Sequence, residues 1–418
     1  MARRTGGRAA TTGVIPGRYA LSVGDPQTET PCGWRWTRLL DVARLETGHT
    51  PSRKKPEYWG GDVPWIGIKS ARAAHGKDIY ETGENTNSLG LENSAARLLP
   101  AGTVCLSRTA SIGYVTRLGR PMATSQDFVN WVCGEGLDSR YLMYVLLAET
   151  ESLFRFAHGT THQTIYFPEV KAFHAMLPPI AEQRRIAAVL GALDDKIELN
   201  RQMNHTLEEM AQAIFKSWFV DFDGHDDLVD SELGPIPRGW KVDSLGTVIE
   251  LKRGYDLPKR KRQPGAVKIV SSAGITGVHS EPKLTGPAVI TGRYGTIGRV
   301  YYLEEPCWPL NTTLYVRDFR GNEPYFAYHL LGMIDFNSFS DKAAVPGVNR
   351  NHLHLEPVIV PPVEAQRSFA RITRPLVEGS WLAERESLTL SDLRDTLLSK
   401  LISGEIRVPE AEEVVEAS

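Results

Sequence analysis

Three residues of this 418-residue chain approach the spacing of a catalytic centre: Asp243, Glu250 and Lys252. They imitate the D-x(n)-E-x-K pattern of metal-dependent nucleases. The pattern is short and often arises by chance. The matching stretch earlier in the chain, residues 41–47, ends in Glu46-Thr-Gly and lacks the lysine. A nuclease centre is therefore kept only as an alternative interpretation.

Other catalytic and cofactor motifs do not assemble in the sequence. Ser111 and Thr296 have no placed His or Asp partner, so nucleophilic catalysis has no support. The chain contains no G-x-x-x-x-G-K-[ST] phosphate loop. Its four cysteines form no CxxC pair, which argues against a cysteine zinc site or a disulfide framework and fits a reducing cytosol. We therefore expect the chain itself to bind no cofactor or metal ion.

Clustered cations indicate a different chemistry, the binding of phosphates. The 48 basic and 50 acidic residues nearly cancel, so any contact with DNA must use local patches. The candidates for backbone contact form two groups: Arg53, Lys54 and Lys55; and Lys252, Arg253, Lys259, Arg260, Lys261 and Arg262. The candidates for base readout are Arg108, Ser111, Thr161, Gln163, Arg293, Tyr294, Thr296, Asn349 and Arg350. Solvated surface loops are the competing interpretation of the basic groups.

The candidates recur because the chain repeats itself. Several short segments occur twice, in the same order: Gly33-Trp34 and Gly239-Trp240; 108–113 and 293–298; 178–184 and 361–367; 207–223 and 390–406. The repeating unit is about 180 to 205 residues long, which excludes a short-period solenoid. The duplication places the two basic groups and the two polar turns at equivalent positions.

Each repeat is predicted to combine a mixed α and β domain with a long helix. Short apolar runs bounded by turn formers predict strands at 102–106, 128–132, 267–270, 288–291 and 313–316. After the two prolines at 178–179, the seam residues alternate in spacing between four and three, which is a heptad pattern. They are Ile186, Leu190, Leu193, Ile197, Asn200, Asn204, Leu207 and Ile214, with Leu393, Leu397 and Leu401 in the second copy. The two Asn layers are of a kind that fixes register at some cost in stability.

The two helices are predicted to pair as an antiparallel two-stranded coiled coil. The first has about 40 residues, which makes a rod of about 60 Å. Pro375 and Gly379 weaken the start of the second, and Glu386 stands where an apolar residue is expected, so a kinked or late-starting helix is predicted there. Such a pair would hold the two globular domains at opposite ends.

The predicted organisation is a pseudo-two-fold internal repeat of α+β class. Its segments are a disordered N-terminal extension (1–32), a first globular domain (33–179), a first long helix (180–223), a linker (224–238), a second globular domain (239–362), a second long helix (363–407) and an acidic tail (408–418). No apolar run approaches the ~18 residues of a membrane span. The basic N-terminus lacks the apolar segment of a secretory signal.

The order of the motifs is typical of one family. The Gly-Trp unit starts, the two Arg-x-x-Ser/Thr-Ile-Gly turns, the Gly159-Thr-Thr-His-Gln163 segment and the runs 178–186, 214–222 and 397–406 occur together. With them, the chain resembles the specificity subunit of a type I restriction–modification enzyme over about residues 33–407. The second copy departs from the family pattern, with Val363-Glu-Ala-Gln366 where a Glu-Gln pair is favoured.

The resemblance implies a non-catalytic DNA-binding subunit. Two target-recognition domains would each read one half of a split, asymmetric site in double-stranded DNA. The coiled coil would space them and dock two modification subunits, which bind S-adenosylmethionine and methylate adenine, while separate restriction subunits would use ATP and Mg²⁺. The implied compartment is the prokaryotic cytoplasm, with no membrane partner. The nuclease and a coiled-coil scaffold that binds only protein remain alternatives. Side-chain geometry and DNA shape would determine the target sequence.

Overall fold

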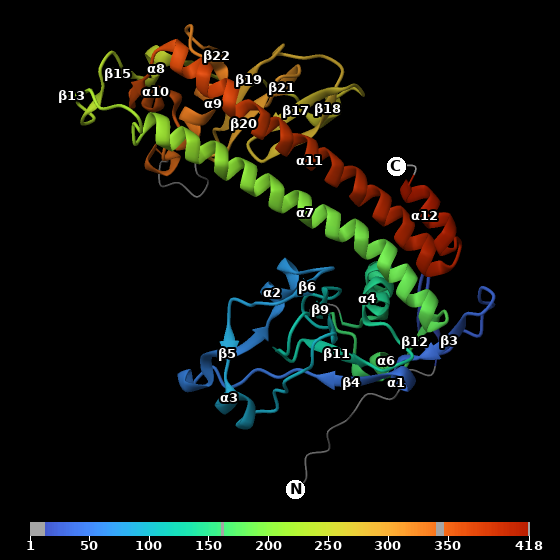
Figure 1. The fold of residues 1–418 in the computed structure, drawn as a ribbon. Helices are drawn as coiled ribbons and strands as arrows, with labels where there is room; N and C mark the ends of the chain where they lie inside the picture. Colours follow the sequence, from blue (N-terminus) through green and yellow to red (C-terminus); the bar gives the residue numbers. More distant parts are fainter. Residues whose placement is uncertain (1–12, 160–162, 340–346, 417–418) are drawn as a thin grey trace. The chain divides into compact units, whose positions relative to one another are not determined.

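The computed structural model describes residues 13–159, 163–339 and 347–416, which divide into two compact units (Figure 1). Unit 1 takes the described chain up to Glu198 and from Ser387 onward, and unit 2 is Leu199–Glu386. Each unit is a mixed α/β domain whose core includes part of two long helices, α7 (Ile180–Phe219) and α11 (Val363–Ser403). The predicted fold class, with two tandem domains and paired long helices, is confirmed.

Unit 1 is built on three sheets. The largest has the order β4 (Ala43–Thr47), β11 (Phe128–Cys133), β8 (Val104–Ser107), β9 (Val115–Leu118) and β6 (Asp78–Ile79). The second has the order β1 (Ile15–Pro16), β2 (Leu21–Val23), β12 (Phe173–Leu177) and β3 (Arg35–Arg38). The third has the order β10 (Ala123–Thr124), β5 (Trp59–Ile66) and β7 (Asn85–Thr86). Its helices are α1 (Leu39–Val42), η1 (Pro56–Tyr58), α2 (Ile68–Ala73), α3 (Ser88–Glu92), α4 (Ser139–Ala148), α5 (Thr150–Phe156) and α6 (Phe167–Lys171).

The core of unit 1 is aromatic at its centre and continues into the long helices. Its largest buried side chains include Trp131, Tyr141, Tyr144, Phe156 and Phe173. The same cluster contains apolar residues from the start of α7 and the end of α11: Ile186, Leu190, Leu193, Leu397 and Leu401. The helices are therefore part of this domain's core, since burying their apolar side chains stabilises both.

The expectation of a disordered extension over 1–32 is wrong for its described part. Strands β1 and β2 extend the sheet through β12, and Leu21 and Val23 are buried. The buried Glu149 carboxylate accepts hydrogen bonds from the backbone amides of Arg18 (2.8 Å), Tyr19 (2.6 Å) and Ala20 (2.7 Å). Pairing with strands and a carboxylate far along the chain orders a segment whose composition alone predicts disorder. Residues 1–12 lie outside the described part.

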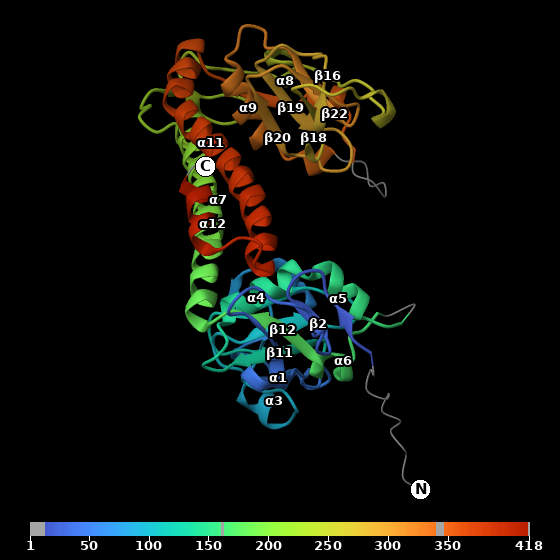
Figure 2. The ribbon, with the colours of Figure 1, turned by 90° about the vertical axis from the view of Figure 1, so that its right-hand side faces the viewer.

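Unit 2 repeats the plan with smaller sheets, and Figure 2 labels the strands of its main sheet together with β18. The main sheet has the order β16 (Glu250–Arg253), β22 (Thr313–Asp318), β19 (Ala288–Gly292) and β20 (Val300–Leu303). The others are β18 (Gly274–His279), β17 (Val267–Ser271) and β21 (Cys307–Pro309); β15 (Lys241–Ser244) and β23 (Pro357–Val360); and β13 (Leu228–Val229) and β14 (Ile236–Pro237). The helices are α8 (Leu245–Val248), η2 (Lys259–Lys261), α9 (Pro324–Met333), η3 (Phe336–Phe339) and α10 (Arg350–Leu353).

The core of unit 2 draws on both long helices. It includes Phe215 and Phe219 of α7, Phe369 of α11 and Phe326 of α9, whose rings lie 4.9 to 5.9 Å from one another in several pairs. The region 224–238 is more than the predicted linker, because β13 and β14 form a hairpin and Ile236 is buried in this core.

Helices α7 and α11 run antiparallel within each unit, and Figures 1 and 2 show them side by side. In unit 1, Arg394 Nη1 donates to Asp194 Oδ1 at 2.8 Å, and Arg407 Nη1 donates to Glu182 Oε1 at 2.7 Å. In unit 2, Asn200 Nδ2 donates to the Ala383 carbonyl at 3.3 Å and to Glu386 Oε2 at 2.8 Å. All eleven predicted seam residues are buried or half-buried.

Of the two alternatives predicted for the second long helix, a kinked or a late-starting helix, the late start is wrong. The helix begins at Val363 and includes Pro375. Phe369, Ala370 and Val377 on both sides of the proline are buried in the core of unit 2, so tertiary packing outweighs the lost backbone hydrogen bond. Glu386, the apparent flaw in the seam, is the acceptor for Asn200, which explains why no apolar residue stands there.

The predicted acidic tail, 408–418, forms a helix over its described part. Helix α12 (Val408–Glu416) follows α11, and Val408 and Ala411 are buried in the core of unit 1. The acidic residues occupy its exposed faces. The helix is therefore amphipathic, a pattern that the high charge of the segment made hard to recognise in the sequence. Across the described helices, none is long and apolar enough to cross a membrane.

Candidate DNA interface

The first polar turn, residues 108–113, joins β8 to β9 in unit 1. Ala110 and Gly113 have positive φ (61° and 95°), so the backbone here is sharply turned. The Ile165 amide donates to the Arg108 carbonyl at 2.9 Å, and the hydroxyls of Thr109 and Thr164 lie 2.6 Å apart. The turn is thereby joined to the segment that carries the exposed Gln163, so the structure brings Arg108, Ser111 and Gln163 into one region.

The Arg108 side chain packs against neighbouring loops of this region and does not extend freely into solvent. It is half-buried, and its guanidinium donates to the carbonyls of Ile165 and Gln126, each at 3.4 Å. The group also lies 4.5 Å from the centre of the Phe167 ring. Burial lowers the pKa of Arg108, and the charge of Asp127 partly opposes that change. The structure thus gives Arg108 a role in holding three loops together, and base readout by this side chain remains a prediction.

The second polar turn, residues 293–298, has the same connections in unit 2. The Arg293 amide donates to the Thr312 carbonyl at 2.8 Å, as the Arg108 amide does to the Asp127 carbonyl at 2.8 Å. The Val348 amide donates to the Arg293 carbonyl at 2.9 Å, which matches the contact between Ile165 and Arg108. The repeated motif therefore builds the same turn, docked on the same kind of segment, in both units.

The side chains around the second turn differ from those around the first. Tyr294 and Thr296 are exposed, and the Arg293 guanidinium lies 4.5 Å from the centre of the Tyr294 ring. Asn349 is the N-cap of α10 and its Oδ1 accepts from the Asn351 amide at 3.0 Å, so this oxygen already has a structural role. Arg350 is exposed in the first turn of α10. The two units thus present different side chains on one scaffold.

One glycine in each unit, Gly48 or Gly254, packs closely against a backbone carbonyl between the polar turn and the basic group. A Cβ on Gly48 would lie 2.0 Å from the Ser125 carbonyl oxygen, and a Cβ on Gly254 would lie 2.1 Å from the Leu310 carbonyl oxygen. Next to the first, Thr50 donates to Gln126 Oε1 at 2.5 Å. Next to the second, Asn311 donates to Asp256. These four polar residues were not predicted from the sequence, although Gly48 and Gly254, at equal distances after the two Gly-Trp pairs, marked their place.

Two of the three cations in the basic group of unit 1 are paired with carboxylates. The Arg53 guanidinium donates to both carboxylate oxygens of Glu84, at 2.6 and 2.9 Å, and stacks 3.9 Å from the Trp59 ring centre. The hydrogen bond with Glu84 raises the pKa of Arg53. Lys55 Nζ lies 3.4 Å from Glu57, whereas Lys54 is exposed. Of the three predicted phosphate contacts, the structure therefore favours Lys54 and gives Arg53 a structural role.

The basic group of unit 2 is more exposed and therefore more accessible to a phosphate backbone. Lys259, Arg260 and Lys261 are exposed and form the short 3₁₀ helix η2. Arg262 is half-buried and donates to the Thr276 carbonyl at 3.2 Å, which ties η2 to β18. On β16, Lys252 is half-buried and the exposed Arg253 lies 3.9 Å from Asp256. The candidate phosphate surface is thus centred on η2. Thr161, a further predicted base reader, lies outside the described residues.

The nuclease candidates do not form a site. Asp243 lies on β15, where its carboxylate accepts from the Ser244 amide at 2.8 Å. Glu250 lies on β16 in another sheet and is paired with Arg317. Within the described residues, no group of three or more His, Cys, Asp or Glu side chains is placed to hold a metal ion.

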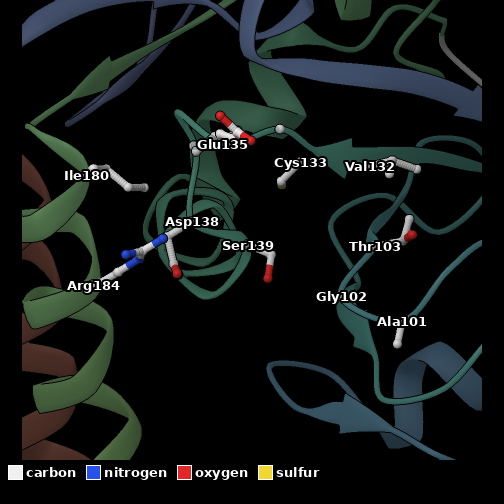
Figure 3. Close-up of a pocket in the computed structure, with 12 residues that line it drawn as sticks. Ala101, Gly102, Thr103, Val132, Cys133, Glu135, Asp138, Ser139, Ile180 and Arg184 are labelled. Atoms are coloured by element: carbon white, nitrogen blue, oxygen red, sulfur yellow. The ribbon is translucent and has the colours of Figure 1, made fainter.

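An open pocket in unit 1 lies where the loop before α4 meets the start of α7. Figure 3 shows Glu135 and Asp138 of the loop, Ser139 at the start of α4, and Ile180 and Arg184 of α7 along its walls. Cys133 also lines it, and burial raises the pKa of this thiol to about 12. A thiol held protonated in this way is a poor nucleophile, so the pocket offers a structural junction rather than a reactive centre.

Comparison with known proteins decides what this duplicated scaffold is. The family described as "Type I restriction modification DNA specificity domain" matches residues 31–209 and 237–386. The chain belongs to this family. The specificity subunit MjaIX of Methanocaldococcus jannaschii is 30% identical over a 415-residue alignment, which covers 91% of this chain and 95% of that protein. The EcoprrI specificity subunit of Escherichia coli is 22% identical, covering 81% of this chain and 86% of that protein.

A solved structure shares the architecture of this type I specificity subunit. The S subunit of a type I restriction–modification system from M. genitalium has a TM-score of 0.61 and 17% identity, and the match covers 90% of this chain and 98% of that one. The family membership confirms the predicted resemblance and makes this chain a non-catalytic subunit for DNA sequence recognition. The nuclease and the protein-only scaffold are thereby set aside.

Proposed function

We propose that this specificity subunit reads a bipartite, asymmetric DNA site, with one half-site for each unit. The observation that carries the proposal is the Arg-x-x-Ser/Thr-Ile-Gly turn, built twice with the same backbone contacts but different neighbours. Equal scaffolds support the same mode of docking on DNA. Unequal side chains, such as Gln163 beside the first turn and Tyr294 in the second, support different half-sites.

The proposed contacts divide into two classes. Lys54 and the η2 cations contact phosphates, which supplies affinity without sequence choice. Gln163, Tyr294 and Thr296 lie in or beside the polar turns, where amide, hydroxyl and aromatic groups suit base edges. Arg53 and Asn349 have structural roles, so we assign them a smaller role in contacting DNA.

We further propose that the long helices dock two modification subunits. Leu199 on α7 is 57% exposed and Leu382 on α11 is 64% exposed. These leucines are separated by the same 183 residues as Asn200 and Ala383, which contact each other, so the helix pair has a local two-fold relation at this point. Large apolar side chains exposed on a coiled coil favour a covering partner. Their symmetric placement supports two copies of it.

The chemistry of the complex would then lie on the partners. Modification subunits would bind S-adenosylmethionine and methylate adenine, and restriction subunits would use ATP and Mg²⁺, in a prokaryotic cytoplasm. The chain would supply the recognition of the DNA sequence and the docking surface for the modification subunits.

Mapping of methylated adenines tests both proposals. The purified chain is combined with its modification subunits, and the methylated sites on genomic DNA are determined. Two different half-sites with a fixed spacer are expected. A single continuous or palindromic site would contradict the bipartite proposal. Leu199→Glu with Leu382→Glu should release the modification subunits in gel filtration, whereas exposed Gln212→Glu, the matched control on α7, should not. Retention by the double variant would contradict the docking proposal.

A further inference from the structure

A buried glutamine stands at the same place in each long helix. Gln183 is the fourth residue of α7, and Gln366 is the fourth residue of α11. Both side chains are almost fully buried. They belong to the repeated segments 178–184 and 361–367, so the duplication gives two independent examples of one arrangement.

In unit 1, Gln183 joins three segments. Its Oε1 accepts from the backbone amide of Asp138, the N-cap of α4, at 2.9 Å. Its Nε2 donates to the carbonyls of Gly136 at 3.1 Å and of Pro178 at 2.9 Å. The side chain thus uses its acceptor and both amide hydrogens. It ties the loop before α4 and the end of β12 to the first turn of α7, at the junction shown in Figure 3.

In unit 2, Gln366 makes the corresponding contacts. Its Oε1 accepts from the amide of Glu323, the N-cap of α9, at 2.9 Å. Its Nε2 donates to Asn322 Oδ1 at 2.8 Å and to the Pro361 carbonyl at 2.9 Å. The helix N-cap and the proline carbonyl are therefore shared by both sites, although the recognition domains differ in length and sheets.

We infer that Gln183 and Gln366 are positioning residues that set the angle at which each long helix leaves its recognition domain. A change of this angle would pull the buried glutamine amide away from its three partners, and a buried polar group left without a hydrogen bond is costly. In a subunit that reads two half-sites, the angle determines where each polar turn falls along the DNA. The glutamines are therefore expected to control spacer discrimination. This consequence rests on the proposed bipartite reading.

The test compares Gln183→Ala and Gln366→Ala with Gln202→Ala, an exposed glutamine on α7. Each variant is assembled with the modification subunits, and its methylated sites are mapped. We expect both half-site sequences to persist while sites with spacers one base pair shorter or longer gain methylation. Discrimination against these spacers should fall by about tenfold, the scale on which loss of a buried hydrogen bond changes an equilibrium. The Gln202 control should keep the original spacer.

Amide hydrogen exchange gives a second readout that needs no DNA. The Asp138 amide should exchange faster in Gln183→Ala, and the Glu323 amide faster in Gln366→Ala, each without effect on the other unit. If an alanine variant does not fold, Gln183→Glu and Gln366→Glu keep the acceptor and remove the two donors. These variants are then expected to relax the spacer in the same way.

The outcomes separate the inference from the proposed function. Altered half-sites, or methylation confined to the original spacer at any level, would overturn the positioning role. A continuous site for the unmodified protein would instead overturn bipartite reading, whatever the glutamine variants do.

Discussion

Replacing the exposed cations of η2 tests how the subunit holds DNA. Changing Lys259, Arg260 and Lys261 to glutamine removes three charges and leaves the contact of Arg262 with Thr276 in place. Each cation that neutralises a phosphate adds about 0.9 to the slope of log affinity against log salt. We therefore expect the slope to fall by up to about 2.7. Between about 50 and about 200 mM salt, this means that the affinity of the unmodified protein falls about 40-fold more than that of the variant.

The assay is fluorescence anisotropy of a labelled duplex with the assembled complex, at several salt concentrations. Arg53→Gln is the matched control, because Arg53 is paired with Glu84 and stacked on Trp59. This control should lower the melting temperature of unit 1 and leave the slope nearly unchanged. The reasoning fails if the η2 variant keeps the original slope, or if Arg53→Gln lowers it equally. An altered sequence preference in the η2 variant would refute the division between phosphate and base contacts.

Three further predictions concern the helices and the core. Inserting one heptad after Leu207 adds about 10 Å of helix, so methylation mapping should find the same half-sites with a spacer longer by at most about three base pairs; altered half-sites would contradict this. Asn200→Leu should raise the melting temperature and loosen the register with α11, measured by cysteine cross-linking, since a polar seam residue favours specificity over stability; a lower melting temperature would oppose this reasoning. Burial lowers the pKa of His329 to about 4, so its neutral form is favoured in the folded state, and stability should fall as the pH drops from about 6.5 towards 4, by about 3 kcal/mol in total. His329→Phe should flatten this dependence in denaturant titrations, and an unchanged slope would refute the assignment.

The sequence predicted the features that depend on short spacings. The heptad pattern placed α7 and its seam, and the repeat placed the two polar turns that the structure builds with the same backbone contacts. Glu386 departs from the heptad pattern of the second helix. The reason is its hydrogen bond with Asn200 on the other helix, which the sequence of one helix cannot show.

Features that depend on distant partners were not predictable. The order of the N-terminal segment comes from β12 and from Glu149, about 130 residues away. The charge of Arg53 was visible in the sequence, but its pairing with Glu84 and its stacking on Trp59 were not. Pro375 predicts a kinked or late-starting helix from local geometry, but the helix begins at Val363 because the burial of neighbouring residues outweighs that local preference.

Exchange of one polar turn tests the central claim most directly. Tyr294→Thr, Gly295→Ala and Thr296→Ser together give the second turn the side chains of the first, and Ala110 shows that the first turn accepts alanine at a positive φ. The methylated sites of the assembled complex are then mapped beside those of the unmodified protein. The account predicts that one half-site changes while the other half-site and the spacer are retained. A change in both half-sites, or in neither while DNA binding persists, would contradict it.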